Sequence, residues 1–119
     1  ADNLKRTKVE GGRVVRRDAV RWLAAGSAAA GVDGGPFAVV IVDPPYRDTA
    51  LLAAALESLG DPSLGWLTDD AVVIAKHFWK DAPPPVAGSL RAVRDRRFGE
   101  TALRQYRPGH PEQQEPEPA

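Results

Sequence analysis

An apolar run that meets two prolines constrains this sequence more than any other segment. Residues 37–42 are all apolar, and Asp43-Pro44-Pro45-Tyr46 follows directly. Continuous apolar character is typical of a parallel strand that is covered on both faces. Each proline fixes φ and lacks an N–H, so the strand has to end there and the loop after it is stiff. The sequence therefore predicts a buried parallel strand that carries a rigid polar loop.

The loop combines a carboxylate (Asp43), a carbonyl oxygen (Pro44) and an aromatic ring (Tyr46). These groups suit the binding of a planar ring that bears an amino group, such as a nucleobase turned out of its helix. The same residues could instead only end the strand and pack, because Asp and Pro are common in loops. We predict that Asp43, Pro44, Pro45 and Tyr46 form a catalytic loop.

Composition narrows the class of protein. The 119 residues are enough for one domain with a modest core. The chain has no cysteine, which excludes disulfides and thiolate metal sites, and His77 and His110 are too few and too separated to predict any metal site. No apolar run approaches a membrane span and no signal peptide is visible. We expect a cytoplasmic protein that does not contact a membrane.

Basic residues gather in two segments although the net charge is zero. Seven Lys and Arg lie within residues 5–21, and six Arg lie within residues 91–107. Such clusters are typical of phosphate-binding surfaces, but they also occur as plain solvated faces. Charge alone therefore leaves nucleic-acid binding open.

Hydrophobic periodicity and capping residues predict the order of elements. The predicted elements are a helix end at 2–8, a strand at 13–17, a helix from the cap Asp18 to Ala30, a strand at 37–42, a helix from the cap Asp48 to Gly60, a strand at 71–75, a stiff connector at 81–88, and a hairpin of strands 90–98 and 101–107. From Pro108 onward we expect a disordered tail, because it has no apolar anchors.

Alternating strands and helices predict an α/β fold with three parallel strands, to which the hairpin adds an antiparallel edge. Ligands of open α/β sheets bind beyond the carboxyl ends of the strands. Asp18, the loop 43–46 and His77 each follow a predicted strand, so we expect them at a single site.

Three stretches also resemble a known family. They are Asn3-Leu4 with Val14–Ala19, then Phe37–Tyr46, and then Arg97–Arg107, which is the most specific of the three. On these residues the chain resembles the second half of a class I S-adenosylmethionine-dependent methyltransferase. More narrowly, it is similar to the bacterial 16S ribosomal RNA guanine-N2 methyltransferases of the RsmD type. The resemblance covers residues 3–107.

The resemblance implies a Rossmann-like sheet and a cofactor, S-adenosylmethionine. Asp18 and Ala19 would lie on the adenine side of that cofactor, and Asp43 would lie beside it. Asp43 and the carbonyl of Pro44 would accept hydrogen bonds from the guanine 2-amino group, and Tyr46 would stack on the base. The implied partner is 16S rRNA in the small ribosomal subunit or an assembly intermediate, bound by a monomer.

Arg96, Arg97, Arg104 and His77 are the candidate RNA-binding residues, together with Arg107. The arginines could instead be solvated charges on the hairpin. Lys76 and His77 could instead be an exposed pair of residues at the end of a strand. Relatives commonly carry an acidic residue where this chain has Lys76.

One part of the family pattern is missing. Neither Gly11-Gly12 nor Gly34-Gly35 opens a helix after a buried strand, so neither can be the glycine-rich cofactor loop. We therefore expect residues 1–107 to be the C-terminal part of a methyltransferase domain without its N-terminal cofactor half, followed by the tail 108–119. A DNA adenine-N6 methyltransferase and a non-catalytic RNA-binding or ribosome-assembly module remain the alternatives.

Overall fold

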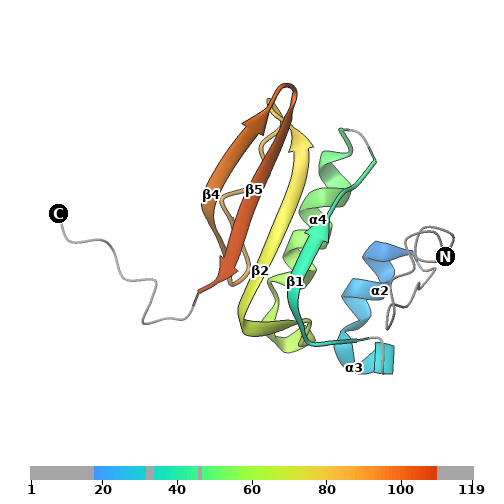
Figure 1. Cartoon of the computed structure of the whole chain (residues 1–119). Coiled ribbons are helices and arrows are strands. Elements are labelled where there is room, and N and C mark those ends of the chain that lie inside the picture. Colours follow the sequence, from blue (N-terminus) through green and yellow to red (C-terminus); the bar gives the residue numbers. More distant parts are fainter. Residues whose placement is uncertain (1–17, 32–33, 46, 110–119) are drawn as a thin grey trace, which may run out of the picture.

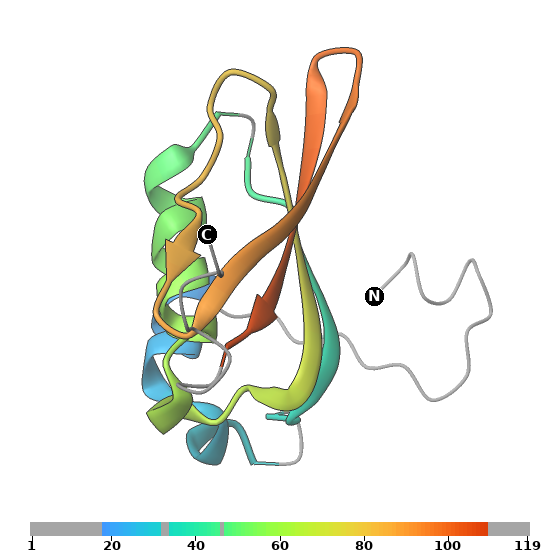
Figure 2. The same cartoon turned by 90° about the vertical axis from the view of Figure 1, so that its left-hand side faces the viewer.

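A mixed sheet with helices on one face makes up the computed structural model, which describes residues 18–31, 34–45 and 47–109 (Figures 1 and 2). The elements are α2 (Ala19–Ala25), α3 (Ser27–Ala30), β1 (Phe37–Val42), α4 (Thr49–Leu59), the 3₁₀ turn η2 (Pro62–Leu64), β2 (Leu67–Phe78), β3 (Val86–Ala87), β4 (Leu90–Phe98) and β5 (Thr101–Pro108). The five strands follow the order β1-β2-β5-β4-β3. β1 and β2 are parallel, and the other pairs are antiparallel.

This arrangement confirms the predicted α/β sheet with an antiparallel hairpin at its edge. The hairpin strands turn at Gly99-Glu100 as predicted. The predicted helix end at 2–8 and the third parallel strand at 13–17 lie outside the described residues.

Both predicted helix caps are present. The Asp18 carboxylate accepts the Arg21 N–H at 3.1 Å, and the Asp48 carboxylate accepts the Leu51 N–H at 3.0 Å. The single helix predicted from Asp18 to Ala30 was wrong, because Gly26 interrupts it with φ 92°. The left-handed region is open to glycine at little cost, so the chain turns there and α3 starts in a new direction.

The core lies between α4 and the inner face of the sheet. Its buried members are Leu52, Leu56, Leu59, Trp66, Val73, Ala75, Ala87, Leu90 and Tyr106. Trp66 joins α2 to this core: its ring centroid is 4.6 Å from that of Trp22, and its Nε1–H donates to the Leu23 carbonyl at 2.8 Å. The indole therefore satisfies its one donor while the ring is buried.

Tyr106 ties the connector between β2 and β4 to the sheet. Its ring is fully buried and its hydroxyl donates to the Pro84 carbonyl at 2.6 Å. Burial raises the pKa of the Tyr106 phenol, which keeps it protonated as a donor. The connector has no helix, as predicted, but it does form the short strand β3.

The expectation that β1 is covered on both faces was wrong. Val40 and Val42 pack against the core, whereas Val39 and Ile41 are 61% and 68% exposed. Alternate residues of a strand point to opposite faces. The helices α2, α3 and α4 lie on one side of the sheet (Figure 2), the side on which Val40 packs, and no element of the described ranges covers the Val39 face.

β2 runs from Leu67 to Phe78, well beyond the predicted 71–75. The acidic pair Asp69 and Asp70 obscured its start, but both residues are exposed and a strand tolerates them there. At its other end, Lys76 to Phe78 pair with β5, so His77 lies within the strand and not after it. β5 likewise extends through Pro108, one residue into the predicted tail.

Replacing Tyr106 by Phe tests the anchoring of the connector. We expect the free energy of unfolding to fall by about 1–2 kcal/mol, because the Pro84 carbonyl loses its donor. Urea denaturation measures the change. Ser63→Ala removes an exposed hydroxyl that bonds only within its own turn, and should change stability by less than about 0.5 kcal/mol. Equal stability of Tyr106→Phe and the parent would show that the hydroxyl does not stabilise the fold.

Candidate functional site

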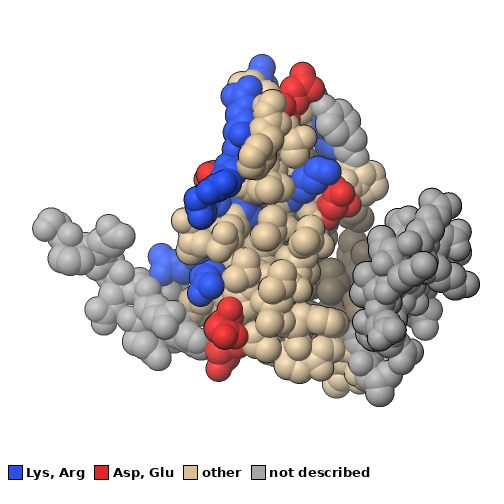
Figure 3. All heavy atoms as spheres, viewed as in Figure 1, with Lys and Arg blue, Asp and Glu red and all other residues tan. Residues whose placement is uncertain are grey.

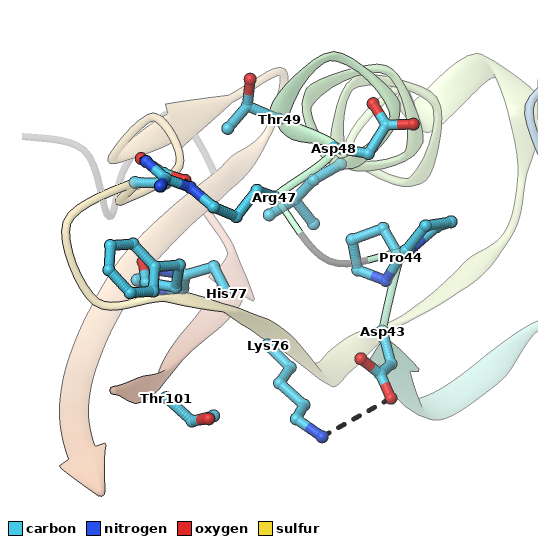
Figure 4. A pocket seen from close by; sticks show the side chains of 12 residues that line it. Asp43, Pro44, Arg47, Asp48, Thr49, Lys76, His77 and Thr101 are labelled. Carbon is cyan, nitrogen blue, oxygen red and sulfur yellow. Dashed lines mark hydrogen bonds and ion pairs between the residues drawn. The ribbon is translucent and has the colours of Figure 1, made fainter. Parts of the chain in front are cut away.

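A pocket lies at the C-terminal ends of β1 and β2, next to the start of α4. Its cavity volume is about 290 Å³, close to the lower end of small-ligand sites. It is lined by Asp43, Pro44, Pro45, Arg47, Asp48, Thr49, Leu52, Lys76, His77, Phe78, Asp81 and Thr101. Figure 4 shows Asp43 and Pro44 after β1, Lys76 and His77 near the end of β2, and Asp48 and Thr49 at the start of α4. The predicted loop and the end of β2 therefore do form one site.

Turn geometry holds the loop after β1. The Pro45 carbonyl accepts the Asp48 N–H at 2.9 Å, and Asp48 in turn caps α4. The Pro44 carbonyl has no backbone donor among the described residues. Asp43 and Pro44 thus both line the pocket, while Tyr46 lies outside the described residues.

Lys76 lies beside Asp43. Its Nζ is 3.7 Å from Asp43 Oδ2 (Figure 4), and the two side chains are about half exposed. An exposed pair of this kind adds little stability. Its consequence is local: an ammonium donor and a carboxylate acceptor stand next to each other at the mouth of the pocket.

Arg47 joins the loop after β1 to the turn after β2. Its guanidinium donates to both carboxylate oxygens of Asp81, at 2.8 and 3.1 Å, and lies 4.5 Å from the ring centroid of Phe78. The hydrogen bonds from Arg47 hold the pKa of the Asp81 carboxyl below its usual range. The Arg47 backbone has φ 61°, a conformation that residues other than glycine seldom adopt. The contacts of its side chain help to hold the backbone in that conformation.

His77 contributes a nitrogen atom without a partner to this region. Its Nδ1 is 2.7 Å from the Phe78 carbonyl, which can only accept, so Nδ1 carries a proton. Nε2 is buried and makes no hydrogen bond among the described residues. In neutral histidine Nε2 is then an acceptor, available to a donor that enters the pocket.

Arg104 has partners inside the protein. It forms a two-point ion pair with Asp95 at 2.8 and 3.2 Å, donates to the Pro83 carbonyl at 2.5 Å, and its side chain is only 16% exposed. The hydrogen bond to Asp95 raises the pKa of Arg104 and lowers that of Asp95. These contacts favour a structural role over the predicted RNA contact. Arg96, Arg97 and Arg107 are exposed.

Asp18 and Ala19, predicted to bind a cofactor, do not line the pocket. Both are exposed at the start of α2, and Asp18 caps that helix. Within the ranges that the structure describes, no cluster of three or more His, Cys, Asp or Glu is arranged for a metal, and no helix is long and apolar enough to cross a membrane.

Sequence reasoning missed Arg47, Asp81 and Thr101. Asp81 lies in a turn that its own sequence does not distinguish from solvent-exposed loops, and Thr101 reaches the pocket only because β5 pairs with β2. Arg47 directly follows the predicted catalytic loop, which was the one available signal.

Residues 1–107 match the model of a protein family described as conserved hypothetical protein 95. The matched range includes every residue that lines the pocket. Among curated proteins, none matches this sequence.

Three solved structures are similar to this one. A protein of Escherichia coli described as "Putative methyltransferase yhhF" is 30% identical, with a TM-score of 0.70, and the match covers 91% of this chain and 55% of that chain. A conserved hypothetical protein of Streptococcus pyogenes is 22% identical, with a TM-score of 0.67 and coverage of 88% and 60%. A protein of Haemophilus influenzae described as "putative methylase HI0767" is 21% identical, with a TM-score of 0.66 and coverage of 92% and 63%. The latter two show the fold alone, and this chain spans little more than half of each structure.

The Arg47–Asp81 pair should make the free energy of unfolding depend on pH in the acid range. Because the pKa of Asp81 is lower in the folded protein, its stabilising contribution is complete above the pKa of an unfolded carboxyl, about 4, and is lost as pH falls through the folded value. We expect Asp81→Asn to unfold at lower urea concentration than the parent at neutral pH, with the gap closing at acid pH. Asp69→Asn, which removes an exposed carboxylate of β2, is the matched control. A gap that stays constant with pH would contradict the role assigned to this pair.

Proposed function

The chain belongs to the conserved hypothetical protein 95 family, and from this premise we propose that it carries the target-base site of an S-adenosylmethionine-dependent methyltransferase. The proposed substrate is the exocyclic 2-amino group of a guanine in 16S rRNA, within the small subunit or an assembly intermediate. The proposed setting is the cytoplasm, and the proposed state is a monomer. The observation that supports the proposal is that Asp43 and Pro44 line a pocket at the end of β1.

The hydrogen-bonding groups of the pocket fit an amine with two N–H bonds. The Asp43 carboxylate and the Pro44 carbonyl only accept, and Pro44 has no N–H of its own to compete. Accepting both amine hydrogens would orient the nitrogen lone pair away from the two oxygens. Such positioning supplies much of the rate in a direct displacement. Asp43 is also placed to take up the proton that the amine loses.

Neighbouring side chains complete the proposed base site. Tyr46 would stack on the base, a contact worth about 1–3 kcal/mol. Lys76 would donate to an oxygen or nitrogen acceptor on the same base, since its ammonium is 3.7 Å from the Asp43 carboxylate. His77 Nε2, which is buried and has no hydrogen-bond partner among the described residues, would accept from a further N–H or hydroxyl.

The described residues offer two carboxylates to the proposed cofactor. One oxygen of Asp18 accepts the Arg21 N–H, and the exposed carboxylate retains capacity to accept from an adenine amino group. Asp43 would border the reacting end. When bound, S-adenosylmethionine would supply a methyl group on a positively charged sulfur.

The length of the match sets the scope of the proposal. This chain spans 55% of the Escherichia coli protein, so the proposal concerns the part of the site that these residues contribute. The description of that protein as a methyltransferase supports methyl transfer. The choice of guanine in rRNA is supported by the resemblance of Arg97–Arg107 to the RsmD type.

Methyl transfer from labelled S-adenosylmethionine to small ribosomal subunits tests the proposal. In a protein that binds S-adenosylmethionine, as measured by calorimetric titration, we expect labelling of 16S rRNA. Asp43→Ala should then lower kcat/KM by about 100-fold or more, because the amine loses its acceptor. Asp69→Ala removes an exposed carboxylate near the start of β2, at the opposite end of that strand from the pocket, and should retain full activity. Nucleoside analysis of the product identifies the methylated base.

Two results would point elsewhere. Labelling of adenine N6 in DNA, without labelling of rRNA, would assign the same loop to DNA. Binding of RNA without affinity for S-adenosylmethionine, measured by calorimetric titration of the folded chain, would replace the enzyme by a non-catalytic RNA-binding module.

A further inference from the structure

Beside the pocket, an arginine lies flat against a tryptophan. Trp79 directly follows β2, and Arg97 is the penultimate residue of β4. The Arg97 Cζ is 3.7 Å from the centre of the Trp79 ring, and the Nζ of Lys80 is 5.1 Å from that centre. Two turns that are distant in sequence thus build one cluster of an indole and two cations.

Backbone hydrogen bonds fix both members of the pair. The Arg97 Nε donates to the Gly99 carbonyl at 2.7 Å, and the Trp79 N–H donates to the Glu100 carbonyl at 2.9 Å. The guanidinium plane is therefore held on one side by the indole and along its edge by the hairpin turn. Arg97 is exposed, so the face of the guanidinium turned away from the indole is open to solvent.

This cluster continues the wall of the pocket. Phe78, which lines the pocket, has its ring centroid 6.3 Å from that of Trp79, and it pairs with Thr101, which lines the pocket as well. Figure 3 shows Lys and Arg side chains gathered over the hairpin, while the centre of the same face is mostly uncharged. Lys80, next to Trp79 in the chain, is exposed, and Glu100 is the one acidic residue in the hairpin turn.

A fixed, exposed guanidinium plane is a stacking surface for a nucleobase. We propose that Arg97, backed by Trp79, stacks on an unpaired RNA base adjacent to the target nucleotide, and that Lys80 contacts its phosphate. The position next to the target nucleotide rests on the proposed function. The binding of single-stranded RNA to Arg97 and Trp79 does not, because it needs neither cofactor nor methyl transfer.

Variants of Arg97 separate stacking from charge. The experiment measures the affinity of the whole chain for a labelled single-stranded RNA, an oligouridylate, by fluorescence anisotropy. We expect Arg97→Lys, which keeps the charge but loses the planar group, to weaken binding roughly ten-fold, nearly as much as Arg97→Ala. Trp79→Ala should weaken binding by a similar factor, because the guanidinium loses its support.

Arg107→Ala is the matched control for charge. Arg107 is exposed on the same hairpin, but it lies at the end of β5 far from the Gly99 turn. Its removal should cause a smaller loss of affinity that disappears at high salt, as expected for a phosphate contact. The loss in Arg97→Lys should persist at high salt.

Side-chain NMR signals give a second readout that does not depend on variants. The chain has three tryptophans, and the Nε1–H of Trp66 is buried and bonded to Leu23. On addition of RNA we expect the Trp79 indole and Arg97 Nε–H signals to shift while the Trp66 signal stays. If Trp79→Ala fails to fold, as judged by thermal melting, the RNA affinity of Arg97→Lys and the NMR titration still test whether Arg97 stacks on a base.

Three outcomes would overturn the proposal. They are wild-type affinity in Arg97→Lys, unchanged Trp79 and Arg97 signals on RNA binding, and a defect seen with DNA of the same sequence but not with RNA. If the chain methylates RNA and Arg97→Lys binds RNA as tightly as the parent, the proposed function stands and the stacking role of Arg97 is wrong. A chain that binds RNA through Arg97 but transfers no methyl group would do the reverse.

Discussion

The parallel pairing of β1 with β2 determines where the site can form. Val42, the last residue of β1, pairs with Ala75, so Asp43 lies level with Lys76 of β2, and Asp43 Oδ2 is 3.7 Å from Lys76 Nζ. Parallel strands end on the same edge of a sheet, which places both loops side by side without further folding information. α4 secures this register from behind, because its buried leucines pack on the inner face of β2.

Antiparallel pairing of β5 with β2 extends the site beyond the first loop. The pair Phe78 and Thr101 brings the hairpin turn onto the end of β2, and Trp79 then bonds to the Glu100 carbonyl. On the opposite side of Phe78, Arg47 links the loop after β1 to Asp81. The two loops and the hairpin are therefore fastened to one another through arginine–aromatic contacts and short hydrogen bonds, which suits a pocket that has to keep its polar groups in place.

Local signals predicted the elements and the first half of the site. The carboxylates that cap α2 and α4, the prolines that end β1 and the Gly99-Glu100 turn act over a few residues, so their effects are readable in sequence. The contacts that the sequence did not predict join residues that are distant in the chain. The pairing of Arg104 with Asp95 and that of Arg47 with Asp81 require the register of the sheet, and nothing near either arginine indicates it. The exposure of β1 was missed for the same reason, since a continuous apolar run does not state what covers each face.

The same contrast makes the proposed base binding and the proposed methyl transfer separable by experiment. Every residue that lines the pocket lies between Asp43 and Thr101, and the Arg97–Trp79 pair falls inside that range. The residues proposed to contact the RNA are therefore carried by β1, β2 and the β4–β5 hairpin. Asp18, assigned to the cofactor, stands apart at the start of α2 and does not line the pocket. A loss of cofactor affinity would leave the pocket and its neighbouring stacking surface intact, whereas a loss of the β2–β5 pairing would remove both at once, because it separates Thr101 from Phe78 and Trp79 from the hairpin turn.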